Sequence, residues 1–413
     1  MNEVYRPIDD CRMCHGTELM KVLDLGTQTL TGIFPKSETE PVPGGPLQLL
    51  KCQTCGLVQL AHNYNSNLLY GDNYGYRSGL NRSMVEHLGR KARRLQEIAG
   101  LTQNDLVIDI GSNDGTLLGS YTVPGLMRVG IDPTGSKFRQ YYQPGIELIP
   151  ECFSAAAFQR NFGSRKAKVI TSIAMFYDLE RPLDFVRQIV EVLADDGLWT
   201  FEQSYLPSMI ATNSYDTICH EHLEYYGLKQ IHYFTRQLGL KIVDLEITDV
   251  NGGSFSVTVA KQNSSHAEMT SKVDKLLAQE TADGFDTAEP FQRLSQAMQS
   301  HREELLRFLE GSLSEGRRVF GYGASTKGNV ILQYCGIDRQ LLSCVAEVNP
   351  DKFGSFTPGT LIPIVSEADA RQAEPHAFLV LPWHFRRNIV QKETAFLAAG
   401  GNLVFPLPKL EIV

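Results

Sequence analysis

Two segments of the chain share a pattern that strongly restricts its possible folds: a buried strand, a glycine-rich turn and a helix. The first occupies residues 106–118 (LVIDIGSNDGTLL) and the second residues 319–334 (VFGYGASTKGNVILQY). Other apolar runs, such as MRVGID and AKVITSIAMF near the first and HAFLVLPW near the second, alternate with helical patterns. This alternation is typical of parallel sheets covered by helices. We therefore expect an α/β protein with two Rossmann-like domains.

The length and charge of the chain set further limits. Its 413 residues exceed what one hydrophobic core usually organises, so we expect three parts: a cysteine-containing module over residues 1–80, an α/β domain over 81–262 and a second α/β domain over 263–413. The net charge of -8 comes without a long basic run, which argues against nucleic acid as a partner. The sequence lacks a secretion signal and an apolar run of membrane-spanning length, so we expect a cytoplasmic protein with no membrane partner.

Four cysteines form two CxxC pairs in the first part, Cys11 with Cys14 and Cys52 with Cys55. Each pair can supply two thiolates from one tight turn, and the two pairs complete a tetrahedral set for Zn²⁺. With sulfur at all four positions, the metal would be structural rather than catalytic. Two unrelated buried pairs, or a redox CxxC, are the alternatives.

The first glycine-rich turn departs from the dinucleotide fingerprint and is acidic. Asp109 ends the strand and Asp114 lies in the turn, where both carboxylates would repel a pyrophosphate. They would favour a cationic ligand such as S-adenosylmethionine (SAM), which carries a sulfonium and an ammonium group. The predicted SAM contacts in this turn are Asp109, Gly111, Ser112, Asn113, Asp114 and Gly115.

Two later positions complete the predicted SAM site. Asp132 ends the next strand and suits the two ribose hydroxyls, as in dinucleotide folds. Cys152 and Phe153 follow the third strand and would form a wall for the adenine. The alternative is a purely structural connection between strand and helix.

The second glycine-rich turn fits neither the dinucleotide fingerprint nor a P-loop, because Thr326 stands at the third glycine position and Asn329 follows Gly328. It still offers helix-start amides, the Ser325 hydroxyl and Lys327, which together suit an anion. His384 and Arg386 follow the strand HAFLVLP and would lie at the same sheet edge. These residues predict a pocket for a nucleotide diphosphate, with a structural turn as the alternative.

The segment YDTICHEHLEYY (215–226) concentrates titratable groups, with His220, Glu221 and His222 in succession. A metal site, a core segment and an acid/base site are all possible. We favour the acid/base site, because an imidazole with a pKa near 6.5 can accept a proton and neighbouring hydroxyls can stabilise an enolate. His220, Glu202 and Asn251 could line the same pocket and contact the substrate, although Asn251 could also simply form a turn.

In combination these motifs, with NGGS at 251–254 and EVNPDKFGSFTPGT at 347–360, resemble SAM-dependent sugar C-methyltransferases that act on nucleotide-linked keto-deoxysugars, such as the sugar C-3 methyltransferase of tetronitrose biosynthesis. The resemblance implies a zinc-binding module, a class I SAM-methyltransferase domain and a C-terminal Rossmann-like domain that helps to bind a TDP- or GDP-linked sugar. It also implies methylation at C-3 of a 4-keto-6-deoxysugar through an enolate.

The resemblance further implies that His222 is the base, Glu221 its partner and Tyr76 a residue near the reaction. It also directs attention to two departures from the tetronitrose enzyme: Cys219 replaces a tyrosine, and Tyr177 replaces a histidine. A SAM-dependent O- or N-methyltransferase acting on a small metabolite, and a SAM-binding protein without catalysis, are the alternative functions.

Overall fold

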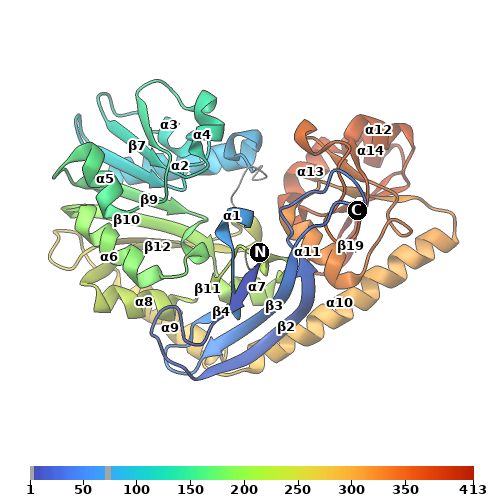
Figure 1. Ribbon diagram of the computed structural model, residues 1–413, viewed down its shortest axis with the longest axis horizontal. Helices are drawn as coiled ribbons and strands as arrows, with labels where there is room; N and C mark the ends of the chain where they lie inside the picture. Colours follow the sequence, from blue (N-terminus) through green and yellow to red (C-terminus); the bar gives the residue numbers. More distant parts are fainter. Residues whose placement is uncertain (1–3, 70–75) are drawn as a thin grey trace.

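The computed structural model describes residues 4–69 and 76–413, which form an N-terminal β-module and two sheets flanked by helices (Figure 1). The seven-stranded sheet has the order β12-β13-β10-β9-β6-β7-β8, and the six-stranded sheet has the order β16-β15-β14-β17-β18-β19. The expected α/β architecture with two Rossmann-like sheets is therefore confirmed. No helix within the described ranges is both long enough and apolar enough to cross a bilayer.

The N-terminal module is built on a long antiparallel hairpin. Its strands are β1 (Tyr5–Pro7), β2 (Leu19–Thr29), β3 (Gly44–Cys52), β4 (Val58–Leu60) and β5 (His62–Tyr64), followed by α1 (Ser66–Leu69). Strands β2 and β3 form the hairpin, and β1 pairs with β5. The short strand β11 (Glu224–Tyr225), distant in sequence, pairs with β4 and extends the hairpin sheet. The segment 215–226 is thereby attached to the module.

The seven-stranded sheet is buried on both faces. Its strands are β6 (Leu106–Ile110), β7 (Met127–Ile131), β8 (Ile146–Ile149), β9 (Ala167–Ile173), β10 (Leu193–Ser204), β12 (Leu240–Thr248) and β13 (Ser254–Lys261). Val107 packs in the cluster with α2, whereas its neighbour Ile108 packs in the opposite cluster with α5, α6 and α8. This explains the continuous apolar runs in the sequence. β13 runs antiparallel to both of its neighbours, β10 and β12, and the other strand pairs of this sheet are parallel.

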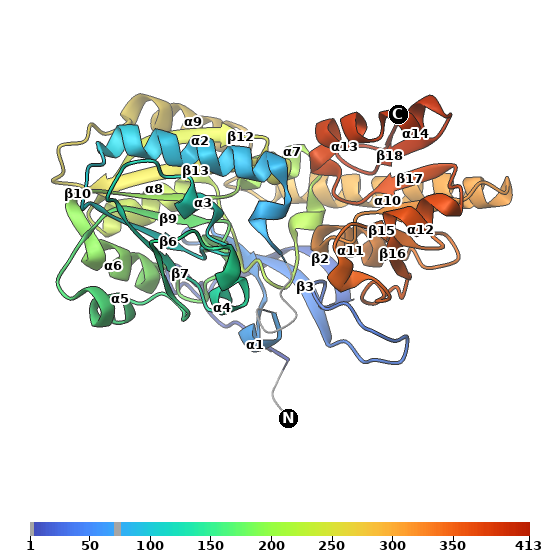
Figure 2. The same cartoon turned by 90° about the horizontal axis from the view of Figure 1, so that it is seen from above.

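The helices around this sheet are α2 (Arg82–Ala99), α3 (Thr116–Gly119), α4 (Gly135–Phe138), α5 (Ala155–Phe162), α6 (Pro182–Val192), α7 (Leu206–Ala211), α8 (Leu228–Gln237) and α9 (Thr270–Ala282). Figure 2 shows α2 lying along one face of the sheet. Helix α9 packs against α8 and β12. The boundaries expected near residues 80 and 262 stay predictions.

The C-terminal sheet is parallel except at one edge. Its strands are β14 (Val319–Tyr322), β15 (Val345–Glu347), β16 (Ile364–Ser366), β17 (Ala377–Val380), β18 (Asn402–Phe405) and the antiparallel β19 (Glu411–Ile412). Its helices are α10 (Glu289–Ser314), α11 (Thr326–Cys335), α12 (Glu367–Gln372), α13 (Arg386–Lys392) and α14 (Thr394–Ala398). The long helix α10 leads into this sheet from the middle part of the chain (Figure 1).

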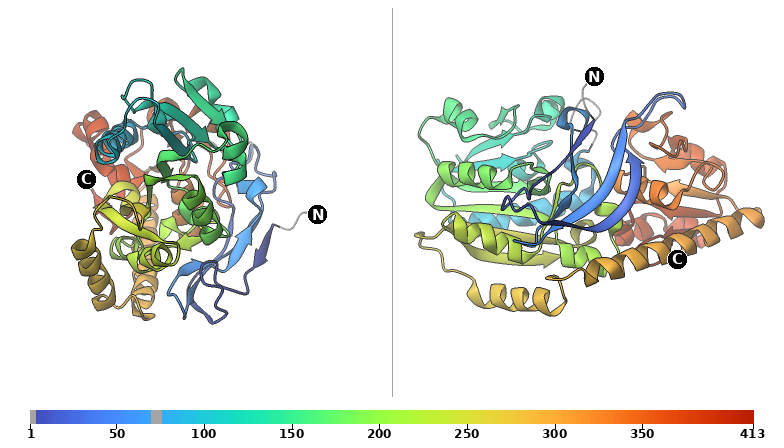
Figure 3. Two further views of the ribbon diagram at one scale, coloured as in Figure 1. Left: turned by 90° about the vertical axis from the view of Figure 1, so that its left-hand side faces the viewer. Right: turned by 60° about the horizontal axis from the view of Figure 1, so that its bottom comes forward.

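The hairpin joins the C-terminal part to the rest of the molecule (Figure 3). The Thr29 backbone N–H donates to the Gln333 side chain at 2.7 Å, and the Gln333 amide donates back to the Thr29 carbonyl at 3.1 Å. The Asn329 amide donates to the Thr31 carbonyl at 2.8 Å. Both partner side chains belong to α11, so the second glycine-rich turn lies where the three parts of the chain meet.

Candidate active site

The four cysteines of the CxxC pairs converge at one end of the hairpin. Their sulfur atoms all lie within 4.8 Å of one another, with Cys11 Sγ 3.6 Å from Cys55 Sγ and Cys14 Sγ 3.5 Å from Cys52 Sγ. A tetrahedral zinc with Zn–S bonds of about 2.3 Å would separate its sulfurs by roughly 3.8 Å. The four thiols therefore fit a zinc ion with little movement, and the pairing across the two knuckles agrees with the sequence prediction.

The first glycine-rich turn connects β6 to α3 through three residues in the left-handed region, Gly111, Asn113 and Gly115, with φ of 72°, 50° and 74°. Asp109 lies buried at the end of β6 and accepts a hydrogen bond from the Thr171 hydroxyl at 2.6 Å. Burial raises the pKa of Asp109 to about 7. The turn thus combines a buried acid with a backbone shape that glycine and asparagine tolerate best.

Asp132 bridges the ends of two adjacent strands. Its Oδ2 accepts from the Asn113 backbone N–H at 2.7 Å, and its Oδ1 accepts from the Thr134 backbone and hydroxyl, both at 2.7 Å. Phe153 is partly buried against the Phe185 ring, with centroids 5.3 Å apart, and Cys152 is exposed. Asp132 is held rigidly at the sheet edge that the sequence predicts for the SAM ribose.

The side chains of Asn113 and Asp114 hold the segment 76–79 beside the turn. Asn113 donates to the Tyr76 carbonyl and accepts from the Ser78 N–H, both at 3.0 Å, and Asp114 accepts from the Gly79 N–H at 2.8 Å. Tyr76 is thereby tied beside the glycine-rich turn and remains 50% exposed. These two turn side chains position Tyr76, a role that their place in the motif did not suggest.

His222 has one ring nitrogen occupied by the backbone. Its Nδ1–H donates to the Thr217 carbonyl at 2.7 Å, and its ring lies 4.3 Å from the Tyr177 ring, measured between centroids. Because a carbonyl only accepts, this bond places the proton on Nδ1 and leaves the Nε2 lone pair available. Burial, and secondarily the charge of Lys327, lowers the pKa of His222 to about 4. The imidazole is therefore neutral at physiological pH and able to accept a proton.

Glu221 points away from His222 and toward the hairpin. Its Oε1 would lie 3.0 Å from a Cβ at Gly32, and its Oε2 is buried without a hydrogen-bond partner in the described part of the chain. Burial raises the pKa of Glu221. The Nδ1 partner of His222 is the Thr217 carbonyl rather than this carboxylate. Thr217 had no signal in the sequence, because a backbone carbonyl leaves no trace in residue type.

Two residues expected near the substrate lie elsewhere. His220 is buried inside the hairpin, with its ring 4.6 Å from that of Tyr64 and its Nε2 3.4 Å from the Gly45 carbonyl. Glu202 is buried against α2, where His87 donates to it at 2.7 Å and Lys91 forms an ion pair with it at 2.7 Å. The structure does not bring either of them beside His222.

The second glycine-rich turn contributes Lys327 directly to the His222 segment. Lys327 Nζ donates to Thr217 Oγ1 at 3.1 Å and to the Asn251 carbonyl at 2.8 Å. The Ser325 hydroxyl caps α11 by accepting from the Gly328 N–H at 3.0 Å. Asn251 itself is left-handed, with φ of 54°.

The other two residues expected at the second turn have different surroundings. Burial, and secondarily Lys327, lowers the pKa of His384 well below its usual value. His384 Nδ1 has no hydrogen-bond partner among the described residues. Arg386 instead pairs with Glu411 at 2.6 Å. His384 thus belongs to the Lys327 region, whereas Arg386 is neutralised at the surface.

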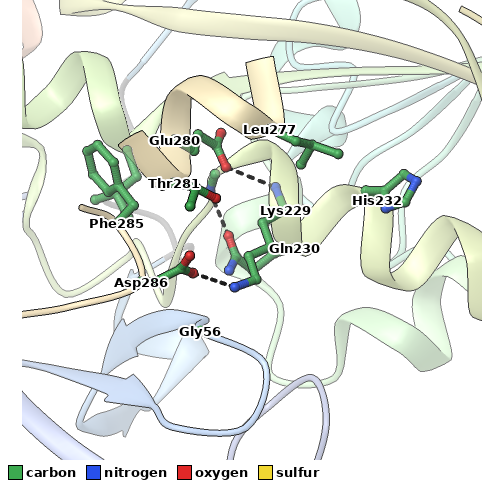
Figure 4. A pocket seen from close by; sticks show the side chains of 11 residues that line it. Gly56, Lys229, Gln230, His232, Leu277, Glu280, Thr281, Phe285 and Asp286 are labelled. Atoms are coloured by element: carbon green, nitrogen blue, oxygen red, sulfur yellow. Dashed lines mark hydrogen bonds and ion pairs between the residues drawn. The ribbon is translucent and has the colours of Figure 1, made fainter. Parts of the chain in front are cut away.

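A separate cavity of about 230 Å³ lies behind the zinc knuckle, between α8 and α9 (Figure 4). Glu280 accepts there from the backbone N–H groups of Leu228 at 2.6 Å and Lys229 at 3.1 Å, and the Lys229 side chain pairs with Asp286. Its charged groups already satisfy one another. Its lining shares no residue with the predicted SAM contacts or with the His222 segment, so the cavity is a seam between packed elements.

Comparison with known proteins decides the family. Three family models match successive parts of the chain: "Putative zinc binding domain" at residues 11–70, "Methyltransferase domain" at 84–245 and "C-methyltransferase C-terminal domain" at 249–408. The C-methyltransferase NovU of Streptomyces niveus is 30% identical over 419 residues, covering 100% of this chain and 99% of NovU.

The chain belongs to the SAM-dependent C-methyltransferase family. This confirms the family and the enzyme class that the sequence motifs predicted. Among solved structures, an O-methyltransferase family protein from Burkholderia thailandensis has 16% identity and a TM-score of 0.34, covering 45% of this chain and 59% of its own. The plantazolicin methyltransferase BpumL in complex with SAH has 10% identity and a TM-score of 0.34, covering 42% and 82%.

Each of the three matched regions contains a different group of the predicted site residues. The zinc-binding region contains all four cysteines, the methyltransferase region contains the turn from Asp109 to Gly115 and the His222 segment, and the C-terminal region contains Lys327. The site around His222 is thus assembled from separate family regions.

Proposed function

We propose that this C-methyltransferase methylates C-3 of a nucleotide-linked 4-keto-6-deoxysugar by way of an enolate. The observation that carries the proposal is the His222 imidazole, which is partly buried and neutral, with Nδ1–H bound to the Thr217 carbonyl and Nε2 left open. A neutral imidazole with a fixed tautomer can remove a proton from a carbon beside a ketone. Transfer to oxygen or nitrogen does not need this enolate step.

The proposed reaction balances as follows. His222 Nε2 accepts the proton from C-3, and the electrons of the broken C–H bond delocalise onto the C-4 ketone oxygen. Bound SAM supplies the methyl group as an electrophile. C-3 then forms a bond to that methyl carbon, the ketone reforms, and S-adenosylhomocysteine and one proton leave. Positioning contributes much of the rate, because the reacting carbons must approach to about 3–3.5 Å.

Individual residues take the following roles in the proposal. Asp109 and Asp132 hold SAM at the edge of the seven-stranded sheet, with Phe153 beside the adenine. Tyr76, tied to the same turn by Asn113, covers the sugar. Tyr177 supports the imidazole through its ring, which lies against it in a tilted arrangement. The C-terminal sheet receives the TDP or GDP portion of the substrate near Ser325 and His384. The zinc ion is structural.

The decisive experiment incubates the enzyme with SAM and a panel of TDP- and GDP-linked 4-keto-6-deoxysugars. We expect a mass gain of one methylene unit and a new carbon–carbon bond at C-3 by NMR. Without SAM but with S-adenosylhomocysteine in D₂O, we expect the enzyme to exchange the C-3 proton for deuterium. A methyl group on oxygen or nitrogen of the product, with no exchange at carbon, would contradict the proposal and favour an O- or N-methyltransferase.

A further inference from the structure

Lys327 has an unusual place in the chain for a cation. It is the second residue of α11, where the partial positive charge of the helix N-terminus disfavours a lysine. Its ammonium group leaves its own domain and donates to Thr217 Oγ1 at 3.1 Å and to the Asn251 carbonyl at 2.8 Å. Burial lowers the pKa of Lys327. Local helix preference therefore does not explain a lysine at this position, whereas its contacts do.

The C-terminal part also holds Asp216, the residue before Thr217. Trp383 Nε1–H donates to Asp216 Oδ2 at 2.7 Å, and Asp216 is fully buried. The charge of Asp216 partly offsets the burial of Lys327. Two consecutive residues of the middle domain, Asp216 and Thr217, are therefore fixed by side chains of the second Rossmann-like domain.

Thr217 connects these contacts to the base. Its side chain accepts from Lys327, and its carbonyl accepts from His222 Nδ1. We propose that Lys327 is a positioning residue: it fixes Thr217, and through Thr217 it sets the orientation and the tautomer of the His222 imidazole. The proposal rests on the role of His222 in the proposed function. It gives the C-terminal domain a part in catalysis beyond substrate binding.

The positive charge of Lys327 also favours the neutral form of the His222 imidazole. The groups that face His222 are the Tyr177 ring, the Thr217 carbonyl and, from α11, the Lys327 cation, whereas Glu221 turns toward Gly32 and Asp216 bonds to Trp383. Removing the cation removes one cause that keeps the imidazole neutral. The pKa of His222 must then rise, so the acid limb of the pH–rate profile must move to higher pH.

A direct role for Lys327 in binding the diphosphate makes a different prediction. A lysine that contacts the substrate lowers its KM for the nucleotide sugar without affecting the titration of His222. A positioning lysine affects kcat and the acid limb and leaves KM nearly unchanged. The structure favours the second role, because Lys327 Nζ donates to the Thr217 hydroxyl and to the Asn251 carbonyl, which directs it toward the His222 segment.

The test compares K327M, K327R and T217V with the wild type. T217V removes the hydroxyl that receives the Lys327 bond but keeps the backbone carbonyl. Lys352, another partly buried lysine, donates to the Ala324 carbonyl at 2.7 Å and does not contribute to the pKa shift of His222, so K352M is the matched control. For K327M we expect kcat to fall roughly tenfold to a hundredfold, the loss typical of a hydrogen bond to a charged group. For K352M we expect the acid limb to stay in place.

A second readout does not depend on the substrate. The His222 ring resonances, assigned by comparison with His222→Gln, are titrated by NMR in the complex with S-adenosylhomocysteine. We expect a higher pKa for His222 in K327M, a value close to wild type in K327R, and a disturbed Nδ1–H resonance in T217V. An unshifted His222 pKa together with a raised KM in K327M would overturn the inference. If His222→Gln were fully active, the proposed function itself would fail instead, whatever the K327M result.

Discussion

The carbonyl oxygen of Thr217 lies 2.7 Å from Nδ1 of His222 and accepts a hydrogen bond from its N–H. A backbone acceptor holds an imidazole more firmly than a mobile carboxylate does, and it adds no negative charge that would raise the pKa of the ring. The bond keeps the ring in one tautomer, whereas burial and the charge of Lys327 keep its pKa low. This combination suits a base that must be free of its proton before the substrate binds.

Replacing His222 by glutamine is expected to lower kcat roughly 10²- to 10⁴-fold, the range that general base catalysis contributes. SAM affinity, measured by calorimetry, should stay within about twofold of wild type, since the predicted SAM contacts belong to the sheet edge around Asp132. H220Q is the matched control, because His220 is buried in the hairpin. We expect it to lower thermal stability much more than kcat. Near-normal turnover by H222Q would remove the base assignment.

The pH dependence of kcat/KM should reflect the low pKa of His222. Burial lowers that pKa from its ordinary value of 6.5 to about 4, so the imidazole stays unprotonated well below pH 6.5. Activity should accordingly persist to about pH 5 and then fall with the acid limb. A profile recorded from pH 4 to pH 9, with SAM saturating and the nucleotide sugar dilute, measures this limb. An acid limb at the ordinary imidazole value would show that the base is solvated.

Asp132 should control SAM affinity. D132N keeps the shape of the side chain but loses the negative charge of the carboxylate that accepts from Asn113 and Thr134 and that we predict to face the ribose. We expect the Kd for S-adenosylhomocysteine to rise roughly tenfold to a hundredfold, as for the loss of hydrogen bonds to a charged group. Asp195 is a surface residue that pairs with Lys261, so D195N is the control and should bind normally. Equal affinities for the two variants would place the cofactor elsewhere.

The fold was predictable because its signals are local and repeated. Runs such as Val107 and Ile108, whose side chains enter opposite core clusters, read as fully buried strands, and the glycine turns follow them directly. The convergence of the two CxxC pairs was also predictable, because both pairs are needed to complete the four-thiolate ligand set of a zinc ion. These features depend on neighbours in sequence or on residue type alone.

The candidate site was less predictable because its partners come from distant elements. Nothing near Glu202 in sequence indicates His87 and Lys91, and nothing near Arg386 indicates Glu411. The Thr217 carbonyl could not be predicted from residue type at all. Sequence motifs pointed to the segment 215–226 as a candidate site, whereas the direction in which each side chain points was decided by packing between the domains.

Zinc should be needed for activity although its predicted ligands lie outside the segment 215–226. C52S removes one ligand, and Cys52 ends β3, which pairs with β4, to which β11 of the segment 215–226 is paired. We expect mass spectrometry to find one zinc per wild-type chain, and we expect C52S to lose the metal, thermal stability and turnover together. C152S alters an exposed cysteine and should keep its zinc. Full activity of a zinc-free C52S enzyme would contradict a structural role.

Glu202 provides a test that separates a structural carboxylate from a substrate ligand. E202Q leaves Lys91 and His87 without their buried counter-charge, and breaking a buried pair costs about 3–5 kcal/mol of unfolding free energy. The double variant E202Q/K91M removes the stranded cation and should recover much of that loss. Urea unfolding of the two single variants and the double variant gives the coupling energy of the pair. If instead E202Q were as stable as wild type and showed a raised KM for the nucleotide sugar, Glu202 would be a substrate ligand after all.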